Sequence, residues 1–194
     1  MKTRLLIIAA FLVITCSAQQ TGTFKDERDG RIYKTVKIGT QTWMAENLAY
    51  DAGKGSWAYD NDIINVAKYG YLYNWETAVN VAPEGWHLPT DAEWTILTKF
   101  LGGDSLAGGK MKTTTGWESP NTGATNASGF SALPAGYINM LKSGLAGRFA
   151  FFWSSTEIND KSAWLRYLKF DDGESNRNYY FSKDYGFSVR CVKD

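Results

Sequence analysis

The chain has few of the residues that crosslink a protein or bind metals: two cysteines and one histidine in 194 residues. Cys16 lies in an apolar N-terminal segment, so only Cys191 remains for a domain and no disulfide framework is expected. His87 is accompanied by neither an H-E-x-x-H motif nor a cysteine pair, which argues against a zinc site. We therefore expect a fold held by its core, a structural role for His87, and no metal or cofactor.

The chain also lacks a strong net charge. Its formal charge is +1, whereas a nucleic-acid-binding domain usually carries a basic surface. No apolar run reaches the roughly 20 residues that a transmembrane helix needs. The sequence therefore predicts no nucleic-acid partner and no membrane-spanning helix.

The N-terminal segment has the order of a secretory signal peptide over residues 1–18. Two cations, Lys2 and Arg4, precede an unbroken apolar run at Leu5–Ile14, and small or polar residues follow to Ala18. Cleavage after Ala18 gives a soluble exported protein, and lipid modification of Cys16 gives an anchored lipoprotein. We expect a secreted, periplasmic or cell-surface protein, with an outer-membrane lipoprotein as the alternative. The membrane is then a partner only through an anchor at Cys16.

Aromatic residues are abundant, with 8 Trp, 11 Tyr and 10 Phe, and each can bury roughly 150–250 Å² in a core. After the leader, residues 19–23 are predicted to be a short linker and residues 24–194 to be one domain. That length is sufficient for a proper hydrophobic core.

Local patterns predict a mixture of strands and helices. Alternating apolar residues in Arg31–Ile38, followed by Gln41–Ala45, are typical of a hairpin. Thr90 and Glu93 form a capping box, which predicts a helix over residues 91–101. A short helix is expected after Asn74. Further strands are expected at Ala150–Ser154, Trp164–Phe170 and Phe187–Val192.

Two polar stretches, residues 51–70 and 102–128, show no period and are predicted to be a surface loop and an irregular excursion. Gly108-Gly109-Lys110 fails the phosphate-loop pattern because Asp104 stands where glycine is required and Met111 where Ser or Thr is required, which favours an ordinary pair of loop glycines. The acidic clusters at residues 60–62 and 171–174 favour solvated turns, with calcium binding left as an alternative because calcium prefers oxygen ligands.

Several sequence motifs together resemble those of one family, the Fibrobacter succinogenes major paralogous domain. The resemblance covers about residues 24–193 and rests on Asp29–Gly39, Gln41–Leu48, Tyr69–Trp75, Pro83–Thr90, Gly129–Gly136, Trp153–Glu157 and Tyr185–Val192. That family looks like a branch of the formylglycine-generating, sulfatase-modifying fold. The resemblance therefore implies an α+β, C-type lectin-like architecture with antiparallel strands, a main helix and long ordered loops.

The enzymes of that superfamily use two cysteines to hold copper, and this chain departs from them because only Cys191 remains after export. The alternation of Phe187, Val189 and Cys191 predicts a buried, inert thiol. We therefore expect that the protein is not an enzyme.

The remaining hypothesis is recognition, of a glycan or a cell-surface protein, through the C-terminal loops. Aromatic, amide and charged side chains gather there, and they suit sugar rings and protein hot spots. The predicted ligand-binding residues are Trp164, Arg166, Tyr167, Asp171, Asp172, Glu174, Asn176, Arg177, Asn178, Tyr179 and Tyr180. Tyr179 and Tyr180 cannot both point inward from a regular strand, so at least one is expected at the surface. The alternatives are a structural component of the bacterial envelope and a carbohydrate-active enzyme.

Overall fold

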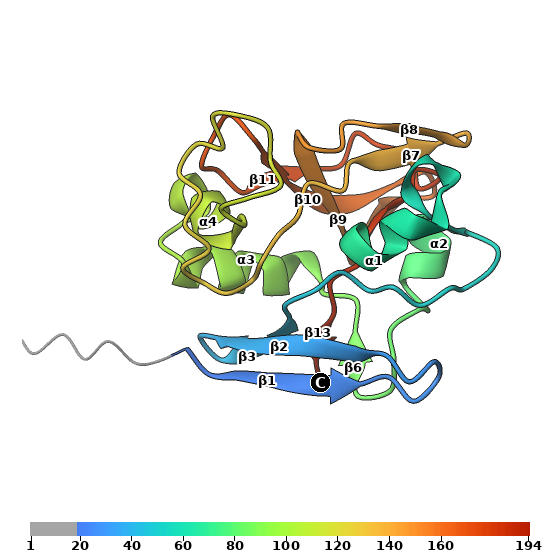
Figure 1. Ribbon diagram of the computed structural model, residues 1–194, viewed down its shortest axis with the longest axis horizontal. Helices are drawn as coiled ribbons and strands as arrows, with labels where there is room; N and C mark the ends of the chain where they lie inside the picture. Colours follow the sequence, from blue (N-terminus) through green and yellow to red (C-terminus); the bar gives the residue numbers. More distant parts are fainter. Residues whose placement is uncertain (1–18) are drawn as a thin grey trace, which may run out of the picture.

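The computed structural model describes residues 19–194, and the predicted signal peptide and Cys16 lie outside the described residues. The five-stranded sheet lies at the lower end of the molecule in Figure 1, and the other two sheets lie in the upper half, with helices on either side of the six-stranded one. Nearly all strand pairs are antiparallel, and β9–β12 is parallel. The protein is thus a mixed α+β fold built mostly from antiparallel sheets.

The strands form three sheets. The first is ordered β1 (Thr21–Lys25), β2 (Ile32–Ile38), β3 (Gln41–Met44), β13 (Val192–Lys193) and β6 (Trp86–His87). The second is ordered β11 (Asn176–Asn178), β10 (Ser162–Lys169), β9 (Phe149–Asn159), β12 (Phe187–Ser188), β5 (Leu72–Tyr73) and β4 (Ser56–Trp57). The third is a hairpin of β7 (Tyr137–Asn139) and β8 (Lys142–Gly144). Residues 21–23 of the predicted linker thus lie in β1.

The structure confirms the main helix predicted from the capping box. Helix α3 (Asp91–Phe100) begins with the capping box, in which Thr90 Oγ1 accepts a hydrogen bond from the Glu93 N–H at 3.2 Å and Glu93 Oε2 accepts one from the Thr90 N–H at 2.8 Å. Trp94, Leu97 and Leu101 are buried, as their spacing predicts. The helix after Asn74 is also present, because the Asn74 side chain caps α2 (Trp75–Ala78).

Both stretches predicted to be irregular contain helices. Residues 51–70 include the 3-10 turns η1 (Tyr59–Asn61) and η2 (Ile63–Asn65) and helix α1 (Val66–Tyr69). Residues 102–128 include α4 (Asp104–Met111). The Gly108-Gly109 pair therefore lies in a helix rather than a loop. A Cβ at Gly108 would overlap the Glu174 carbonyl, and one at Gly109 the Gly123 carbonyl, so close backbone packing explains both glycines.

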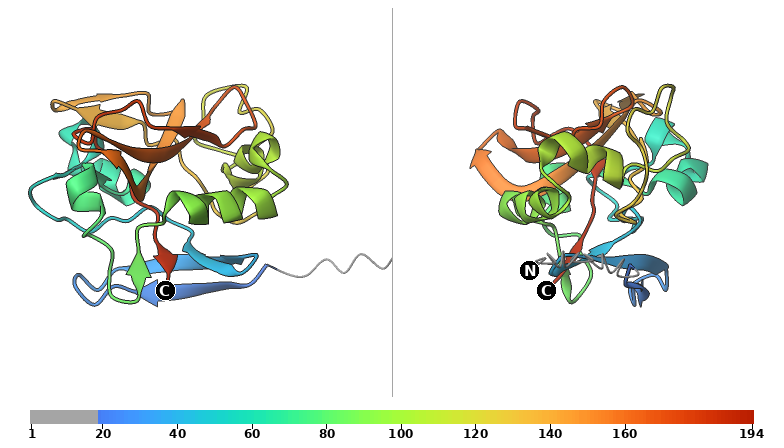
Figure 2. Two further views of the ribbon diagram at one scale, coloured as in Figure 1. Left: turned by 180° about the vertical axis from the view of Figure 1, so that it is seen from behind. Right: turned by 90° about the vertical axis from the view of Figure 1, so that its left-hand side faces the viewer.

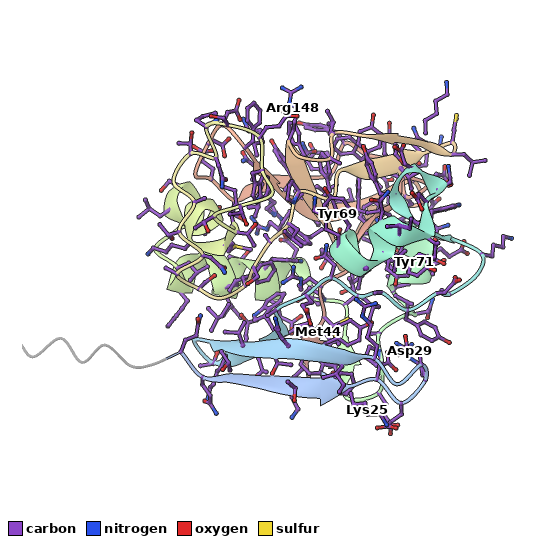
Figure 3. All side chains as sticks on the ribbon, in the orientation of Figure 1. Lys25, Asp29, Met44, Tyr69, Tyr71 and Arg148 are labelled. Carbon is purple, nitrogen blue, oxygen red and sulfur yellow. The ribbon has the colours of Figure 1, made fainter. Side chains whose placement is uncertain are left out.

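The C-terminal segment joins the two sheets. It leaves the six-stranded sheet at β12 and enters the five-stranded sheet at β13, as both views in Figure 2 show. Between these strands Arg190 is fully buried, and it donates hydrogen bonds to Asn47 Oδ1 and to the Met44 and Phe130 carbonyls. Met44 and Tyr71, labelled in Figure 3, belong to the core cluster that also contains Phe187, Val189 and Cys191.

His87 has a more polar setting than predicted. Its Nδ1 lies 2.6 Å from Asp194 Oδ1 and its Nε2 lies 2.8 Å from Glu93 Oε1. Burial lowers the pKa of His87, but the hydrogen bonds to the two carboxylates outweigh burial and raise it above 6.5. The ring thus links β6 with α3, through Glu93, and with Asp194.

Candidate functional site

Four of the predicted residues form a group near the β11 edge of the six-stranded sheet, in which Arg177, Tyr179 and Tyr180 are exposed and Trp164 is half-buried. The Arg177 guanidinium carbon lies 3.3 Å from the centre of the Trp164 ring. The Trp164 ring meets Tyr179 edge-on at 4.9 Å, and Tyr179 lies 4.5 Å from Tyr180. We call Trp164, Arg177, Tyr179 and Tyr180 the aromatic row.

The aromatic row is held at one end by helix α3. Arg177 Nε lies 2.8 and 3.0 Å from the two carboxylate oxygens of Asp91, and Nη2 lies 2.7 Å from Oδ2. Asp91 is the first residue of α3, where the helix dipole favours a carboxylate. This bidentate pair fixes the guanidinium that stacks on Trp164 and neutralises its charge.

A turn of the backbone at Asn178 directs the two tyrosines outward. Asn178 Oδ1 accepts hydrogen bonds from the backbone N–H groups of both Tyr179, at 2.6 Å, and Tyr180, at 2.8 Å. This turn ends strand β11, and Tyr180 is left 78% exposed. The expectation of an exposed tyrosine is confirmed, and Tyr179 is exposed as well.

Arg166 and Tyr167, predicted to bind ligand, lie mostly in the interior instead. Arg166 is 1% exposed and pairs across the strands with Arg177. Its Nη2 donates to Thr95 Oγ1 at 2.8 Å and lies 3.4 Å from Asp91 Oδ1, and burial lowers its pKa. Arg166 therefore supports Asp91 from beneath the aromatic row. The half-buried Tyr167 packs against Phe149 and Phe151.

The predicted acidic loop does not join the aromatic row. Asp172 Oδ2 pairs with Lys169 Nζ at 2.8 Å, and its Oδ1 accepts the Glu174 N–H, so the loop forms a solvated turn. Asp171 lies 3.8 Å from the same ammonium. Beneath the loop, the buried Lys112 Nζ donates to the carbonyls of Thr122, Lys169 and Asp172. An ammonium thus occupies the point where these carbonyls converge.

Asn176, also predicted, faces away from the row. It is half-buried on β11 opposite Tyr167, and its Nδ2 has no hydrogen-bond partner within residues 19–194.

A second site was not predicted from the sequence. A cavity of about 650 Å³ lies against the β7–β8 hairpin, and we call it the hairpin pocket. Its lining residues are Trp57, Asn74, Ile138, Asn139, Met140, Leu141, Ser182, Asp184 and Tyr185. Several distant segments contribute them, including the C-terminal loop at residues 182–185. That volume is in the range of small-molecule sites.

The hairpin that bounds this pocket has a strained turn. Strands β7 and β8 pair at Asn139 and Lys142, which leaves Met140 and Leu141 as a two-residue turn with φ of 47° and 63°. Asn-Gly is preferred where both residues have positive φ, and the left-handed conformation costs about 1–2 kcal/mol for other residues. Met140 is nevertheless 88% exposed and Leu141 65%. Strain of this kind tends to collect at functional sites.

The neighbouring segment holds the hairpin in place. The Asp60 N–H donates to Ser143 Oγ at 2.7 Å, and Asn61 Nδ2 donates to the Leu141 carbonyl at 3.2 Å. Asp60 and Asn61 also have positive φ, of 59° and 54°. The acidic cluster at residues 60–62 therefore contributes a turn that braces the hairpin.

A family model for the Fibrobacter succinogenes major domain matches residues 36–193. The chain belongs to this family. A comparison with curated proteins and one with solved structures each found no match. The matched region contains both the aromatic row and the hairpin pocket, so both sites are parts of the Fibrobacter succinogenes major domain.

Two further properties of the domain bear on its chemistry. Burial raises the pKa of the Cys191 thiol to about 12, and the side chain is fully buried, which confirms the predicted buried thiol. Between residues 19 and 194, no three His, Cys, Asp or Glu side chains are grouped to hold a metal ion. In the same part of the chain, no helix has the length and apolar character needed to cross a membrane.

Proposed function

We propose that this domain is an exported, non-catalytic binding module that recognises glycans through the aromatic row. The observation that carries the proposal is the preorganised arrangement of two exposed rings, Tyr179 and Tyr180, beside the half-buried ring of Trp164. Their orientation is fixed by the Arg177–Asp91 pair and by the Asn178 turn. Exposed rings held this way lose little conformational entropy when a ligand binds.

The chemistry of the aromatic row suits a sugar. A pyranose ring presents C–H groups on its faces, which pack on aromatic rings, and hydroxyls at its edges, which need hydrogen-bond partners. The tyrosine hydroxyls supply such partners. The cation of the row is already paired with Asp91, so the surface favours an uncharged ligand.

Catalysis has less support at this surface. Glycoside hydrolysis usually employs two carboxyl groups across the scissile bond. Asp91, the carboxylate that contacts the row, is held in a bidentate pair by Arg177. A structural role in the envelope would not by itself require the rings to be fixed in place.

The test is a glycan array probed with the domain from residue 19 onward, followed by calorimetry on the best glycan. Trp164→Ala and Tyr180→Ala are expected to weaken binding by about tenfold each, roughly 1.4 kcal/mol. Ile96→Ser is the control, because Ile96 is an exposed residue of α3 that contributes to neither site. The proposal fails if no glycan binds, or if the ring variants bind as tightly as the control.

We further propose that the fold is the C-type lectin-like type of the formylglycine-generating enzymes. The antiparallel sheets around one main helix, with long ordered segments between strands, support this architecture. An experimental structure of the domain, superposed on such an enzyme, tests it: a different order of strands in the sheets would refute it.

Export itself is also a proposal, based on the signal-like residues 1–18. Mass spectrometry of the mature N-terminus decides between its two forms. A chain beginning at Gln19 indicates a soluble product, and a lipid-modified Cys16 indicates an anchored one. Retention of Met1 on the mature protein would refute export by this signal.

A further inference from the structure

We infer that the hairpin pocket is a second, separate site that docks a protein segment carrying a basic side chain flanked by apolar residues. The first observation is the strained turn. Met140 and Leu141 adopt the left-handed conformation and stay exposed, although Asn-Gly would form this turn without strain. The left-handed conformation of these two residues destabilises the fold, and their exposed side chains are available to contact a protein partner.

The chemistry of the pocket rim indicates a protein rather than a sugar. Aliphatic side chains such as Met140 and Leu141 bury well against apolar protein surface, and Met adapts to partners of different shape. The aromatic row, in contrast, presents ring planes. The two surfaces thus differ in the ligand that each can bind.

The charge of the pocket selects the anchoring side chain. Asp184 is the only ionisable acid or base among the residues that line the pocket, apart from the tyrosine hydroxyl. Ser182 Oγ donates to Asp184 Oδ2 at 3.0 Å and orients the carboxylate. Trp57 and Tyr185 also line the pocket, where both are half-buried and Tyr185 packs against Phe181 and Phe187. An arginine or lysine side chain, with its apolar stem and charged end, matches a carboxylate in a pocket lined largely by apolar and aromatic residues.

Neighbouring cations do not satisfy this carboxylate. Lys183, next to Asp184, pairs with Glu157 and lies over the Trp75 ring at 4.1 Å. No salt bridge of Asp184 is present within residues 19–194. A basic side chain from a partner would provide the missing counter-charge.

The experiment uses an array of short synthetic peptides with apolar flanks and a central Arg, Lys, Gln or Glu. Peptides with a central Arg or Lys are expected to bind, those with Gln to bind about threefold more weakly, and those with Glu more weakly still because Asp184 repels a second carboxylate. Asp184→Asn should weaken binding of the basic peptides by about threefold, as expected for a solvent-exposed charge pair.

The decisive variant is Met140→Asn combined with Leu141→Gly. These residues favour the same turn, so the variant should fold at least as stably as the wild type, with a Tm equal or about 2–4 °C higher. It should lose at least about tenfold in peptide affinity, while Ile96→Ser binds normally. Loss of binding in this variant therefore cannot be explained by unfolding.

Three results would overturn the inference. The first is an array in which no basic peptide binds. The second is a stable Met140→Asn, Leu141→Gly variant that binds as well as the wild type. The third is displacement of the peptide by an oligosaccharide, which would make the pocket a glycan site. None of these results bears on the aromatic row, whose test uses different variants.

Discussion

Replacing Lys112 with methionine is expected to destabilise the domain strongly. Lys112 is fully buried, and its ammonium donates to three backbone carbonyls at 2.7–2.9 Å. Burial lowers the pKa of this lysine, so the three hydrogen bonds must offset the loss of hydration. Methionine keeps most of the volume of the side chain but removes every donor, leaving three half-buried carbonyls without this partner.

The magnitude follows from these contacts. Hydrogen bonds to a charged group contribute about 1.5–3 kcal/mol each, and three of them would give roughly 4.5–9 kcal/mol. Burying a cation costs several kcal/mol, and the variant is relieved of this cost, which offsets part of the loss. We expect a net loss of about 3–5 kcal/mol in the free energy of unfolding, which lowers Tm by about 10 °C in a domain of this size.

Chemical and thermal denaturation followed by tryptophan fluorescence measures the loss. Lys110→Met is the matched control: the Lys110 ammonium donates to one carbonyl, that of Leu101, and the residue is half-buried. That variant should lose about 1 kcal/mol or less. If Lys112→Met proves as stable as Lys110→Met, the three hydrogen bonds from Lys112 do not stabilise the fold as their distances indicate.

Two further predictions concern titratable groups. The native Cys191 thiol, with its pKa raised to about 12, should resist thiol reagents at pH 8 and react promptly once the protein is unfolded; rapid labelling of the native protein would refute its burial. Against the effect of burial, Asp194 and Glu93 raise the pKa of His87, and the Thr90 N–H together with His87 lowers the pKa of Glu93. The contacts of His87 therefore stabilise the fold below the unfolded histidine pKa of 6.5 and, for its pair with Glu93, above the unfolded glutamate value of 4.5. This contribution fades as pH rises through the higher folded pKa of His87, or falls through the lower folded pKa of Glu93. The stability difference between wild type and His87→Asn should therefore be largest at pH 4.5–6.5, at about 1 kcal/mol or less because the ring is 38% exposed. A difference that stays constant from pH 5 to pH 9 would contradict this.

Local signals in the sequence predicted the elements that depend on neighbouring residues. The capping box of Thr90 and Glu93 located α3, alternation located β2 and β10, and the turn at Gly39-Thr40 located β3. Helix α4 was missed because Gly108 and Gly109 are poor helix formers. Glycine is required at both positions because the helix contacts the Glu174 and Gly123 carbonyls, which belong to later segments of the chain.

The candidate sites show the same division. Composition indicated Trp164, Arg177, Tyr179 and Tyr180, because these residues are close in sequence and on adjoining segments. The burial of Arg166 could not be predicted, since it depends on α3 packing over β10. The hairpin pocket draws its lining from distant segments, and its Met140-Leu141 turn lacks the Asn-Gly signature that would have indicated a hairpin.

The path of the C-terminal segment has a consequence for how the domain is assembled. Strand β12 lies between β9 and β5, and β13 lies between β3 and β6, so the last strands of the chain are interior members of both sheets. A ribosome releases the N-terminal part first, and until residues 187–193 emerge each sheet has a gap with unpaired strand edges, which tend to associate with other chains. Completion of the domain therefore awaits the synthesis of residues 187–193. A chaperone that shields these open edges during this interval would favour the correct fold.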